Sequence, residues 1–299
     1  MNAAGESPGS GRCTAQPPAG AEETLGAARR FLMSEADLER RFGGLRRLYG
    51  DTAYARLRGL RLAVVGLGGV GSWAAEALAR SGVAGLTLID LDHVSESNVN
   101  RQVQALGRTL GQAKAQALAE RIADIHPACD VTIVEEFVAP DNWPALLPAP
   151  VHGLLDACDQ VRAKLTLAAW ARHTVLAFVT VGAAGGKRMP HRVQVEDLAA
   201  VTHDPLLASL RQRLRKEHGA PRSGAMGVAC VFSREPVLQP ARAEGAACEV
   251  SPDLSCHGYG STVTVTAGFG MVAASVLIEQ ALSSSAALLQ PSTAPEPGA

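Results

Sequence analysis

The 299-residue sequence predicts an α/β protein built on a doubly wound, mostly parallel sheet. Short apolar runs such as Leu62–Val65 and Leu86–Ile89 end abruptly at a glycine or an aspartate, as buried parallel strands do at their carboxyl ends. Stretches of helical pattern separate these runs, and the alternation continues to about residue 181. With 47% apolar and 19% charged residues, the chain can bury a large core.

The ends of the chain differ in composition from its middle. Residues 1–30 are rich in Gly, Ala, Pro and Ser and lack the apolar core of a secretory signal, so we expect a disordered leader. Residues 31–282 form the predicted folded domain, with halves at 31–181 and 182–282, and residues 283–299 form a predicted flexible tail. The six cysteines contain no C-x-x-C pair, which indicates a cytoplasmic protein without a structural zinc.

A glycine-rich turn follows the first predicted strand. Gly66, Gly68 and Gly71 have G-x-G-x-x-G spacing, Gly69 is an addition to the motif, and a helical stretch begins at Ser72. Glycines let a phosphate approach the backbone, and the free N–H groups of a helix N-terminus attract the anion. Asp90 lies 19 residues beyond Gly71, at the end of the next strand, where a carboxylate can accept from a ribose hydroxyl. The arrangement predicts a Rossmann-like nucleotide site.

Charged and amide groups beyond the second strand indicate which nucleotide is bound. The candidate ligands are Asp92, Asn98, Asn100, Arg101, Gln102 and, at the start of the next helix, Lys114. A pyrophosphate in an NAD-dependent oxidoreductase is held mostly by backbone N–H groups, whereas a triphosphate needs such cations, so ATP is favoured over NAD. Asp159 ends another buried strand and is a candidate ligand for Mg²⁺. A nucleotide-binding scaffold without catalysis is a further alternative.

The remaining elements follow from apolar periodicity. We expect strands at 131–134, 151–155, 175–181, 192–196 and 228–232, and helices at 113–125, 142–147, 161–173 and 206–218. Residues 263–282 are apolar enough to raise the question of a membrane span. Gly268, Gly270, Glu279 and Gln280, and the absence of flanking basic clusters, instead favour a core or dimer-interface helix and no membrane.

Taken together, these motifs resemble the E1-like adenylating family of ubiquitin-activating and molybdopterin- and thiamine-synthesis enzymes. The matching segments are Arg41–Gly44, the glycine turn with Ser72 and Trp73, Asp90-x-Asp92, Asn98-x-Asn100-Arg101-Gln102, Lys114 and Asp156-x-x-Asp159. The resemblance implies a C-terminal extension of the E1-like type, and ATP and Mg²⁺ as cofactors. It also implies that a carboxylate attacks the α-phosphate of ATP.

Motifs in the C-terminal half are similar to the branch of this family that dehydrates a modified adenosine of tRNA. They are Gly182–Gly186, Asp204–Leu206, Cys230–Ser233 and Cys256-x-Gly258-x-Gly260. The resemblance implies ATP-dependent cyclisation of N6-threonylcarbamoyladenosine, next to the tRNA anticodon. The alternative is activation of the C-terminus of a sulfur-carrier or ubiquitin-like protein, which the missing zinc-binding cysteine pairs disfavour.

The resemblance also implies individual roles. Arg101, Lys114 and Asp159 would stabilise the charge of adenylation, and Cys256 would capture the acyl group or only line the pocket. Arg41 would reach the ATP phosphates of a partner subunit. Relatives often carry a second arginine three residues on, where this chain has Gly44, so a solvated arginine is an equal alternative. Cys230 lies in an apolar run and is expected to be a buried strand cysteine.

The expected partners are tRNA, a second copy in a homodimer and a possible cysteine desulfurase or sulfur acceptor, but no DNA. Since the net charge is only −1, any RNA contact has to come from a local basic patch. The candidates lie in one polar helix and the loop after it, and are Arg211, Arg213, Arg215, Lys216 and Arg222. The alternative is an ordinary solvated helix face.

Overall fold

The computed structural model describes residues 36–238 and 259–283. The fold belongs to the compact unit that begins at Leu38. The predicted leader, and the predicted tail beyond Ser283, lie outside the described residues.

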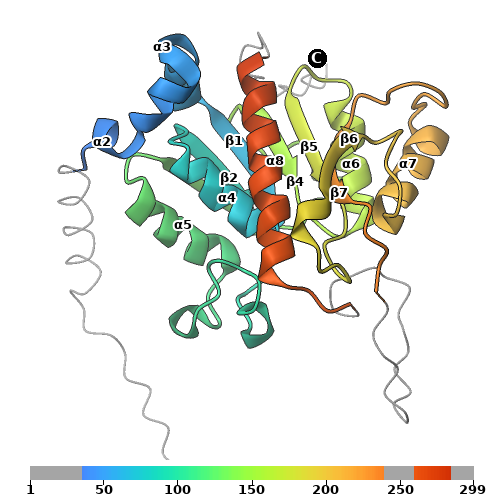
Figure 1. The fold of residues 1–299 in the computed structure, drawn as a ribbon, viewed down its shortest axis with the longest axis horizontal. Coiled ribbons are helices and arrows are strands. Elements are labelled where there is room, and N and C mark those ends of the chain that lie inside the picture. Colours follow the sequence, from blue (N-terminus) through green and yellow to red (C-terminus); the bar gives the residue numbers. More distant parts are fainter. Residues whose placement is uncertain (1–35, 239–258, 284–299) are drawn as a thin grey trace, which may run out of the picture. The chain divides into compact units, whose positions relative to one another are not determined.

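A seven-stranded sheet forms the centre of this unit, in the order β3-β2-β1-β4-β5-β7-β6 (Figure 1). The strands are β1 (Arg61–Val65), β2 (Gly85–Ile89), β3 (Asp130–Val134), β4 (Gly153–Asp156), β5 (Ala177–Val181), β6 (Val193–Asp197) and β7 (Ala229–Ser233). All neighbours pair in parallel except β6, which runs antiparallel to β7 at one edge. The predicted mostly parallel sheet is confirmed, and it extends without interruption from the first half of the chain into the second.

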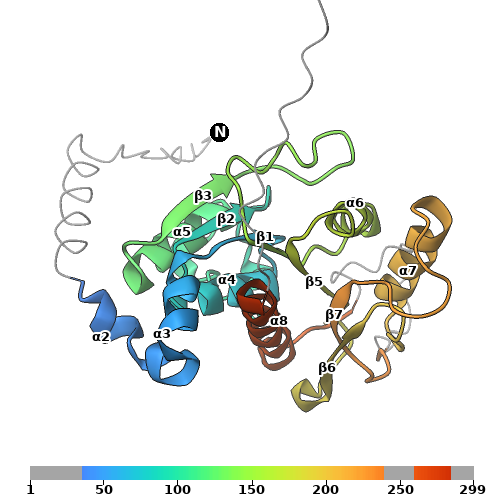
Figure 2. The same cartoon turned by 90° about the horizontal axis from the view of Figure 1, so that it is seen from above.

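Helices cover both faces of the sheet (Figure 2). They are α2 (Leu38–Phe42), α3 (Gly44–Gly59), α4 (Gly71–Arg80), α5 (Lys114–Ile125), α6 (Val161–Ala171), α7 (Pro205–Glu217) and α8 (Val263–Ser283), with 3₁₀ turns η1 (Glu96–Asn98), η2 (Gly107–Thr109) and η3 (Pro190–Arg192). One core contains buried side chains of α4, α5 and α8, and the other contains those of α6 and α7. Successive residues of β1 alternate between these cores, which confirms the doubly wound fold.

The carboxyl ends of three central strands meet at one edge of the sheet. Val65 of β1 is in register with Ile89 of β2 and with Asp156 of β4. The hydrogen bonds continue one residue further, because Gly66 N donates to Ile89 O and Ala157 N donates to Val65 O. The segments that follow β1, β2 and β4 therefore start side by side.

The long apolar helix α8 packs on the sheet. By length and composition it is the one described helix that could cross a membrane, but half of its most apolar stretch is buried within the fold. A Cβ at Gly270 would lie 2.6 Å from the Val70 carbonyl oxygen, so α8 approaches the start of α4 closely. Its expected core position is confirmed, whereas a dimer contact by its outer side stays a prediction.

One predicted element is wrong. Residues 142–147 form a series of turns rather than a helix. Asn142 Oδ1 accepts from Ala139 N at 2.8 Å and its Nδ2 donates to Phe137 O at 2.9 Å, so the side chain ties the turns to the residues before them. Pro144 and Pro148 also lack the N–H groups that a helix requires.

Candidate active site

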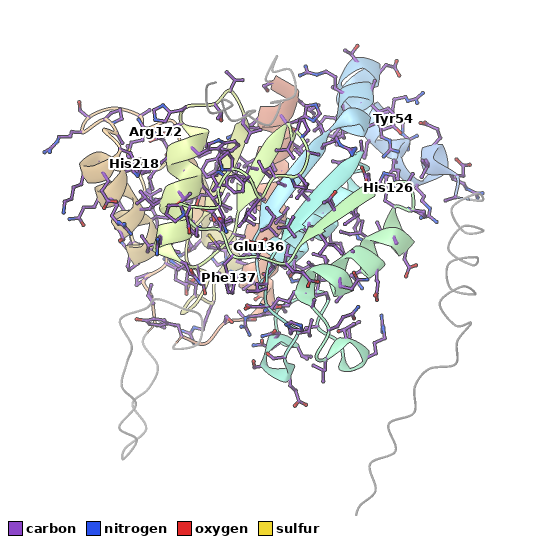
Figure 3. The ribbon with its side chains drawn as sticks, turned by 180° about the vertical axis from the view of Figure 1, so that it is seen from behind. Tyr54, His126, Glu136, Phe137, Arg172 and His218 are labelled. Atoms are coloured by element: carbon purple, nitrogen blue, oxygen red, sulfur yellow. The ribbon has the colours of Figure 1, made fainter. Side chains whose placement is uncertain are left out.

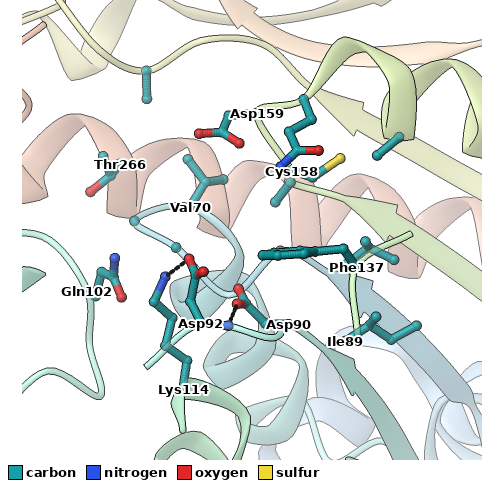
Figure 4. Close-up of a pocket in the computed structure, with 18 of the residues that line it drawn as sticks. Val70, Ile89, Asp90, Asp92, Gln102, Lys114, Phe137, Cys158, Asp159 and Thr266 are labelled. Carbon is teal, nitrogen blue, oxygen red and sulfur yellow. Dashed lines mark hydrogen bonds and ion pairs between the residues drawn. The ribbon is translucent and has the colours of Figure 1, made fainter. Parts of the chain in front are cut away.

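A cavity of about 400 Å³ lies at the carboxyl edge of the sheet (Figure 4). It is the natural ligand position in a doubly wound fold, just beyond the ends of the parallel strands. The predicted site residues that line it are Gly66, Gly68, Gly69, Asp90, Asp92, Asn98, Arg101, Gln102, Lys114 and Asp159. Segments after β1, β2 and β4 thus contribute to a single site.

The turn after β1 requires glycine for steric reasons. Gly66 has a φ of +84°, and a Cβ there would lie 2.8 Å from Cys158 N and 2.9 Å from Ala157 C. A Cβ at Gly71 would overlap the Gly66 carbonyl oxygen. Gly71 does not line the cavity, so its role is to close the turn at the start of α4. The N–H groups of this helix start are thereby brought close to the cavity.

Helix α8 forms part of the wall, which the sequence pattern did not indicate. Thr266 lines the cavity, and a Cβ at Gly69 would lie 3.0 Å from its Cγ2 atom. Asn100, which does not line the cavity, links the loop after β2 to the approach of α8 by donating to Ser261 O at 3.0 Å. The C-terminal helix therefore supports the glycine turn.

Asp90 joins the glycine turn to the end of β2. Its carboxylate accepts from Leu67 N at 2.5 Å and from Asp92 N at 2.9 Å. Burial raises the pKa of this carboxyl above its ordinary value, against the opposing effects of Lys114 and of the two backbone bonds. Asp90 thus orders the turn at the same time as it faces the cavity.

Lys114 is held ready at the cavity by an acidic partner. Its Nζ lies 2.6 Å from Asp92 Oδ2, and its side chain is 9% exposed against 53% for Asp92. Lys114 N also donates to Asp92 O at 2.9 Å, which ties the start of α5 to the loop after β2. A phosphate entering the cavity can replace Asp92 as the partner of the Lys114 ammonium, because the Asp92 carboxylate is half exposed and can turn towards water.

Arg101 is oriented by its own loop. Its Nη1 donates to Ser97 O at 2.7 Å and to Asn100 Oδ1 at 3.0 Å, and its carbonyl accepts from Trp73 Nε1 at 2.9 Å. Asn98 is buried, and its Oδ1 accepts from Ser95 N at 3.1 Å. Within the described chain, Asn98 and Asn100 shape the loop that presents the guanidinium.

Asp159 and Asp156 occupy contrasting environments. Asp159 is exposed, lines the cavity and makes no hydrogen bond or ion pair with the described residues. Asp156 is fully buried: Oδ2 lies 3.0 Å from Lys164 Nζ and accepts from Thr180 Oγ1 at 2.6 Å, and Oδ1 accepts from Cys158 N at 3.2 Å. Although burial opposes the charge of Lys164, the carboxylate beside it raises the pKa of that amine. Sequence reasoning missed Lys164, whose helix reads as simply apolar.

An apolar wall of the cavity was also not predicted. It consists of Ile89, Val138, Ala163 and Phe137, whose side chain is 48% exposed. Phe137 and its neighbour Glu136 follow β3 (Figure 3), and the Phe137 ring lies across the cavity beside Asp90 (Figure 4). A flat apolar wall next to a carboxylate fits a heterocyclic base attached to a ribose.

Of the predicted catalytic residues Arg41 and Cys256, the structure describes only Arg41, which does not line the cavity. Arg41 Nη1 donates to Asp124 O at 3.0 Å and Ile125 O at 2.8 Å, at the C-terminal end of α5. Cys256 lies outside the described residues. Cys230 is buried in β7, as expected, and burial raises the pKa of its thiol well above the ordinary value.

Three arginines of the predicted RNA-binding helix have partners within the chain. Arg211 Nη1 donates to Leu198 O at 3.2 Å and Val201 O at 2.6 Å, Arg213 lies 3.0 Å from Glu217, and Arg215 donates to Pro221 O at 3.1 Å. Lys216 and Arg222 are exposed and bond no described side chain or carbonyl. None of the five lines the cavity.

Fold and cavity together define a nucleotide-binding protein of the adenylating class. Residues 41–291 match the ThiF family, to which this chain belongs. It is 43% identical over 255 residues to the tRNA threonylcarbamoyladenosine dehydratase of Escherichia coli, a match that covers 82% of this chain and 95% of the relative. The Haemophilus influenzae dehydratase is 39% identical over 247 residues, with 82% and 94% covered. The crystal structure of the E. coli enzyme in complex with ATP superimposes with a TM-score of 0.75 at 43% identity, covering 83% of this chain and 96% of that one.

Proposed function

We propose that this chain is an ATP-dependent dehydratase that cyclises N6-threonylcarbamoyladenosine in tRNA. The proposal rests mainly on one observation: Arg101, Lys114 and Asp159 line the same cavity as the glycine turn and an apolar wall. Support comes from the dehydratases of two bacteria, which this chain matches over nearly their whole length.

In the proposed complex, ATP lies with its phosphates at the glycine turn and its adenine at the apolar wall. The phosphates lie against the glycine turn and the N–H groups at the start of α4. Asp90 accepts from the ribose, and the adenine ring packs on Phe137. The Lys114 ammonium then pairs with a phosphate in place of Asp92. The guanidinium of Arg101 neutralises a second negative charge of the phosphates.

The reaction has two steps that together remove one water. An oxygen of the threonyl carboxylate attacks the α-phosphorus, the bond to the pyrophosphate breaks, and an acyl-adenylate forms. A neighbouring group of the same nucleoside then attacks the acyl carbon and AMP leaves, so the carboxylate oxygen departs on AMP. Arg101 and Lys114 stabilise the charge that develops on the phosphates during the first step.

Asp159 fits the role of a Mg²⁺ ligand. Mg²⁺ bound to ATP commonly takes one or two protein carboxylates and completes its shell with phosphates and waters, and Asp159 offers a free carboxylate at the cavity. No cluster of three or more ligating side chains occurs in the described ranges. When bound, Mg²⁺ neutralises phosphate charge and polarises the α-phosphate.

The proposal includes further parts that rest on the family resemblance. The protein works as a cytoplasmic homodimer, and Arg41 reaches the site of the partner subunit. Capture by Cys256 divides the second step in two: the thiolate attacks the acyl carbon and displaces AMP to form a thioester, and the neighbouring group of the nucleoside then displaces the thiolate as the ring closes. A cysteine desulfurase or sulfur acceptor is a possible partner.

The test is a reconstituted reaction with the full-length protein. ATP, Mg²⁺ and tRNA carrying N6-threonylcarbamoyladenosine are incubated with the protein, and tRNA with unmodified adenosine is the matched control. We expect AMP and pyrophosphate only with the modified tRNA, and mass spectrometry of the nucleosides should show the loss of one water. AMP formation that depends instead on the C-terminus of a sulfur-carrier protein would favour the alternative activity.

A further inference from the structure

Three exposed basic side chains lie on the segment that follows the glycine-rich loop after β5. Arg188, His191 and Arg192, here called the η3 strip, are all exposed. No hydrogen bond or ion pair engages their side chains within the described part of the chain. Among the described residues, none therefore competes for the guanidinium groups of Arg188 and Arg192.

A buried hydrogen-bonded clamp, formed by the side chains of Lys187 and Glu235, holds the backbone of the strip. Lys187 is 1% exposed and donates to Ser233 O at 2.9 Å and Glu235 O at 3.1 Å. The buried carboxylate of Glu235 accepts from Arg188 N at 3.0 Å and from Met189 N at 2.8 Å. All four of these bonds end on backbone groups, so the two side chains fix the backbone of the strip to the segment after β7.

The strip adjoins the cavity. Gly182, Ala183 and Ala184 line the cavity wall, and the strip begins four residues later. A Cβ at Gly268 of α8 would lie 3.7 Å from the Pro190 Cβ, and Thr266 of the same helix lines the cavity. In Figures 1 and 2 the yellow segment before β6 lies beside the first half of α8.

Nearby acidic groups do not neutralise the strip. Glu196 faces Arg234 at 3.5 Å, and Asp197 accepts from the backbone N–H groups of Met226, Gly227 and Val228. Glu235 is occupied by the clamp. The arginines of α7, by contrast, already have partners within the chain: Arg211 and Arg215 donate to carbonyls, and Arg213 donates to Glu217.

We propose that the η3 strip binds the phosphate backbone of the tRNA beside the modified nucleoside that enters the cavity, an inference that rests on the proposed function. A guanidinium can bind one phosphate through two N–H groups, and a rigid backbone preserves the spacing of successive contacts. No side chain of the strip or of the basic set on α7 lines the cavity, and the strip is favoured because Arg211, Arg213 and Arg215 are bonded within the chain whereas no described residue bonds the side chain of Arg188 or Arg192. Each phosphate contact releases counterions, so binding through the strip weakens with salt.

The test compares two full-length variants that each lose two positive charges. In the strip variant Arg188→Gln and Arg192→Gln are combined, and in the control Arg47→Gln and Arg108→Gln are combined, at exposed positions on α3 and η2. All four side chains are exposed, so both proteins should keep the thermal midpoint of the wild type. Binding of N6-threonylcarbamoyladenosine-modified tRNA is measured by fluorescence anisotropy at several salt concentrations, and AMP release gives the KM values for tRNA and ATP.

We expect the strip variant to bind tRNA at least tenfold more weakly and to lower the slope of log K against log salt by about two, since about one counterion is released per contact. Its KM for ATP should be unchanged, and the control should resemble the wild type. Wild-type affinity and slope in the strip variant would overturn the proposal, as would a change confined to the control. A shift of the strip variant to a smaller oligomer in light scattering would instead make the strip a contact between copies. Failure of the wild type to cyclise the nucleoside would refute the proposed function itself, independently of the variants.

Discussion

Two carboxylates three residues apart, Asp156 and Asp159, serve opposite purposes. Asp156 is fully buried and satisfied by Lys164, Thr180 and the backbone, so it orders the turn after β4. Asp159 lies at the end of that turn, exposed on the cavity wall and without a bond to any residue that the structure describes. An Asp-x-x-Asp motif therefore combines a structural residue with a candidate ligand, and burial distinguishes them.

The substitution Asp159→Asn should abolish ATP turnover while leaving the thermal midpoint nearly unchanged. An exposed side chain without internal partners supports little packing, whereas an amide lacks the negative charge that holds Mg²⁺ against ATP. Pyrophosphate release measures turnover, and a thermal melt measures the midpoint. Wild-type protein assayed at a raised Mg²⁺ concentration is the reference for both. A large drop in the midpoint together with normal turnover would assign Asp159 a structural role.

Substitutions at Cys256 distinguish two mechanisms of ring closure. If its thiolate captures the acyl group, Cys256→Ala should still release pyrophosphate with ATP and modified tRNA but form no cyclic nucleoside, because adenylation precedes thiol attack. If the residue only lines the pocket, Cys256→Ala and Cys256→Ser should cyclise at a reduced rate. We expect the first result. Substantial cyclic product from Cys256→Ala would refute covalent catalysis and leave Arg101, Lys114 and Asp159 as the catalytic set.

At the scale of elements, two contacts hold helices in place through titratable groups, one against the sheet and one against another helix. The first is the ion pair that joins α6 to β4 and β5, with Lys164 beneath the cavity. The second is the contact of α2 with the end of α5, where the Phe42 ring lies 4.6 Å from that of His126. Both groups are almost inaccessible to solvent, so changes in their charge act on folding directly.

Removing one partner of the buried pair should be costly. We expect Lys164→Met to lower the free energy of unfolding by about 3–5 kcal/mol, because the Asp156 carboxylate would remain buried without its counter-charge. The double substitution Lys164→Met and Asp156→Asn should recover much of this loss, since no unpaired charge is left. Urea denaturation of both variants provides the measurement. Equal stability of Lys164→Met and the wild type would show that water or a neighbouring group compensates the carboxylate.

The contact of α2 with α5 should weaken at mildly acidic pH. Burial, followed by the nearby charge of Arg58, lowers the pKa of His126 to about 4. An exposed histidine in the unfolded chain has a pKa of about 6.5. Below that value the unfolded state binds the proton first, so stability is full above pH 6.5 and falls as pH approaches 4.

Between pH 7 and pH 5 the loss attributable to His126 should be about 2 kcal/mol. Urea unfolding at both pH values, in the wild type and in His126→Gln, isolates this contribution. The variant should show a smaller decrease, because glutamine does not titrate. An identical decrease in the two proteins would mean that another group determines the acid sensitivity.

At the scale of the whole molecule, the proposed homodimer gives Arg41 two possible roles. In its own chain it bonds the carbonyls of Asp124 and Ile125, which orders the end of α5. In a partner's site it would contact ATP phosphates. These roles differ in whether one subunit can supply what another lacks.

Mixed dimers distinguish the two roles. Arg41→Ala and Lys114→Ala proteins should each be inactive alone, but co-refolded mixtures should regain adenylation, since a heterodimer combines Lys114 of one subunit with Arg41 of the other. Light scattering first establishes that the protein is a dimer. Mixtures as inactive as the separate variants would show that Arg41 does not act across subunits, and a fully active Arg41→Ala protein would remove it from the site.

The sequence by itself determined the doubly wound sheet and most of the cavity lining, because those features depend on local pattern. Gly66, Asp90 and Lys114 lie within consecutive strand–helix units, where spacing along the chain dictates proximity at the sheet edge. Only the tertiary structure showed that Thr266 supports the glycine turn, that Phe137 forms an apolar wall and that Lys164 pairs with Asp156. It likewise showed that Arg211 is bound to carbonyls, whereas no residue in the described ranges bonds the Arg188 side chain. Such features depend on contacts between distant segments, which neither composition nor periodicity encodes, since periodicity specifies only which face of an element is buried.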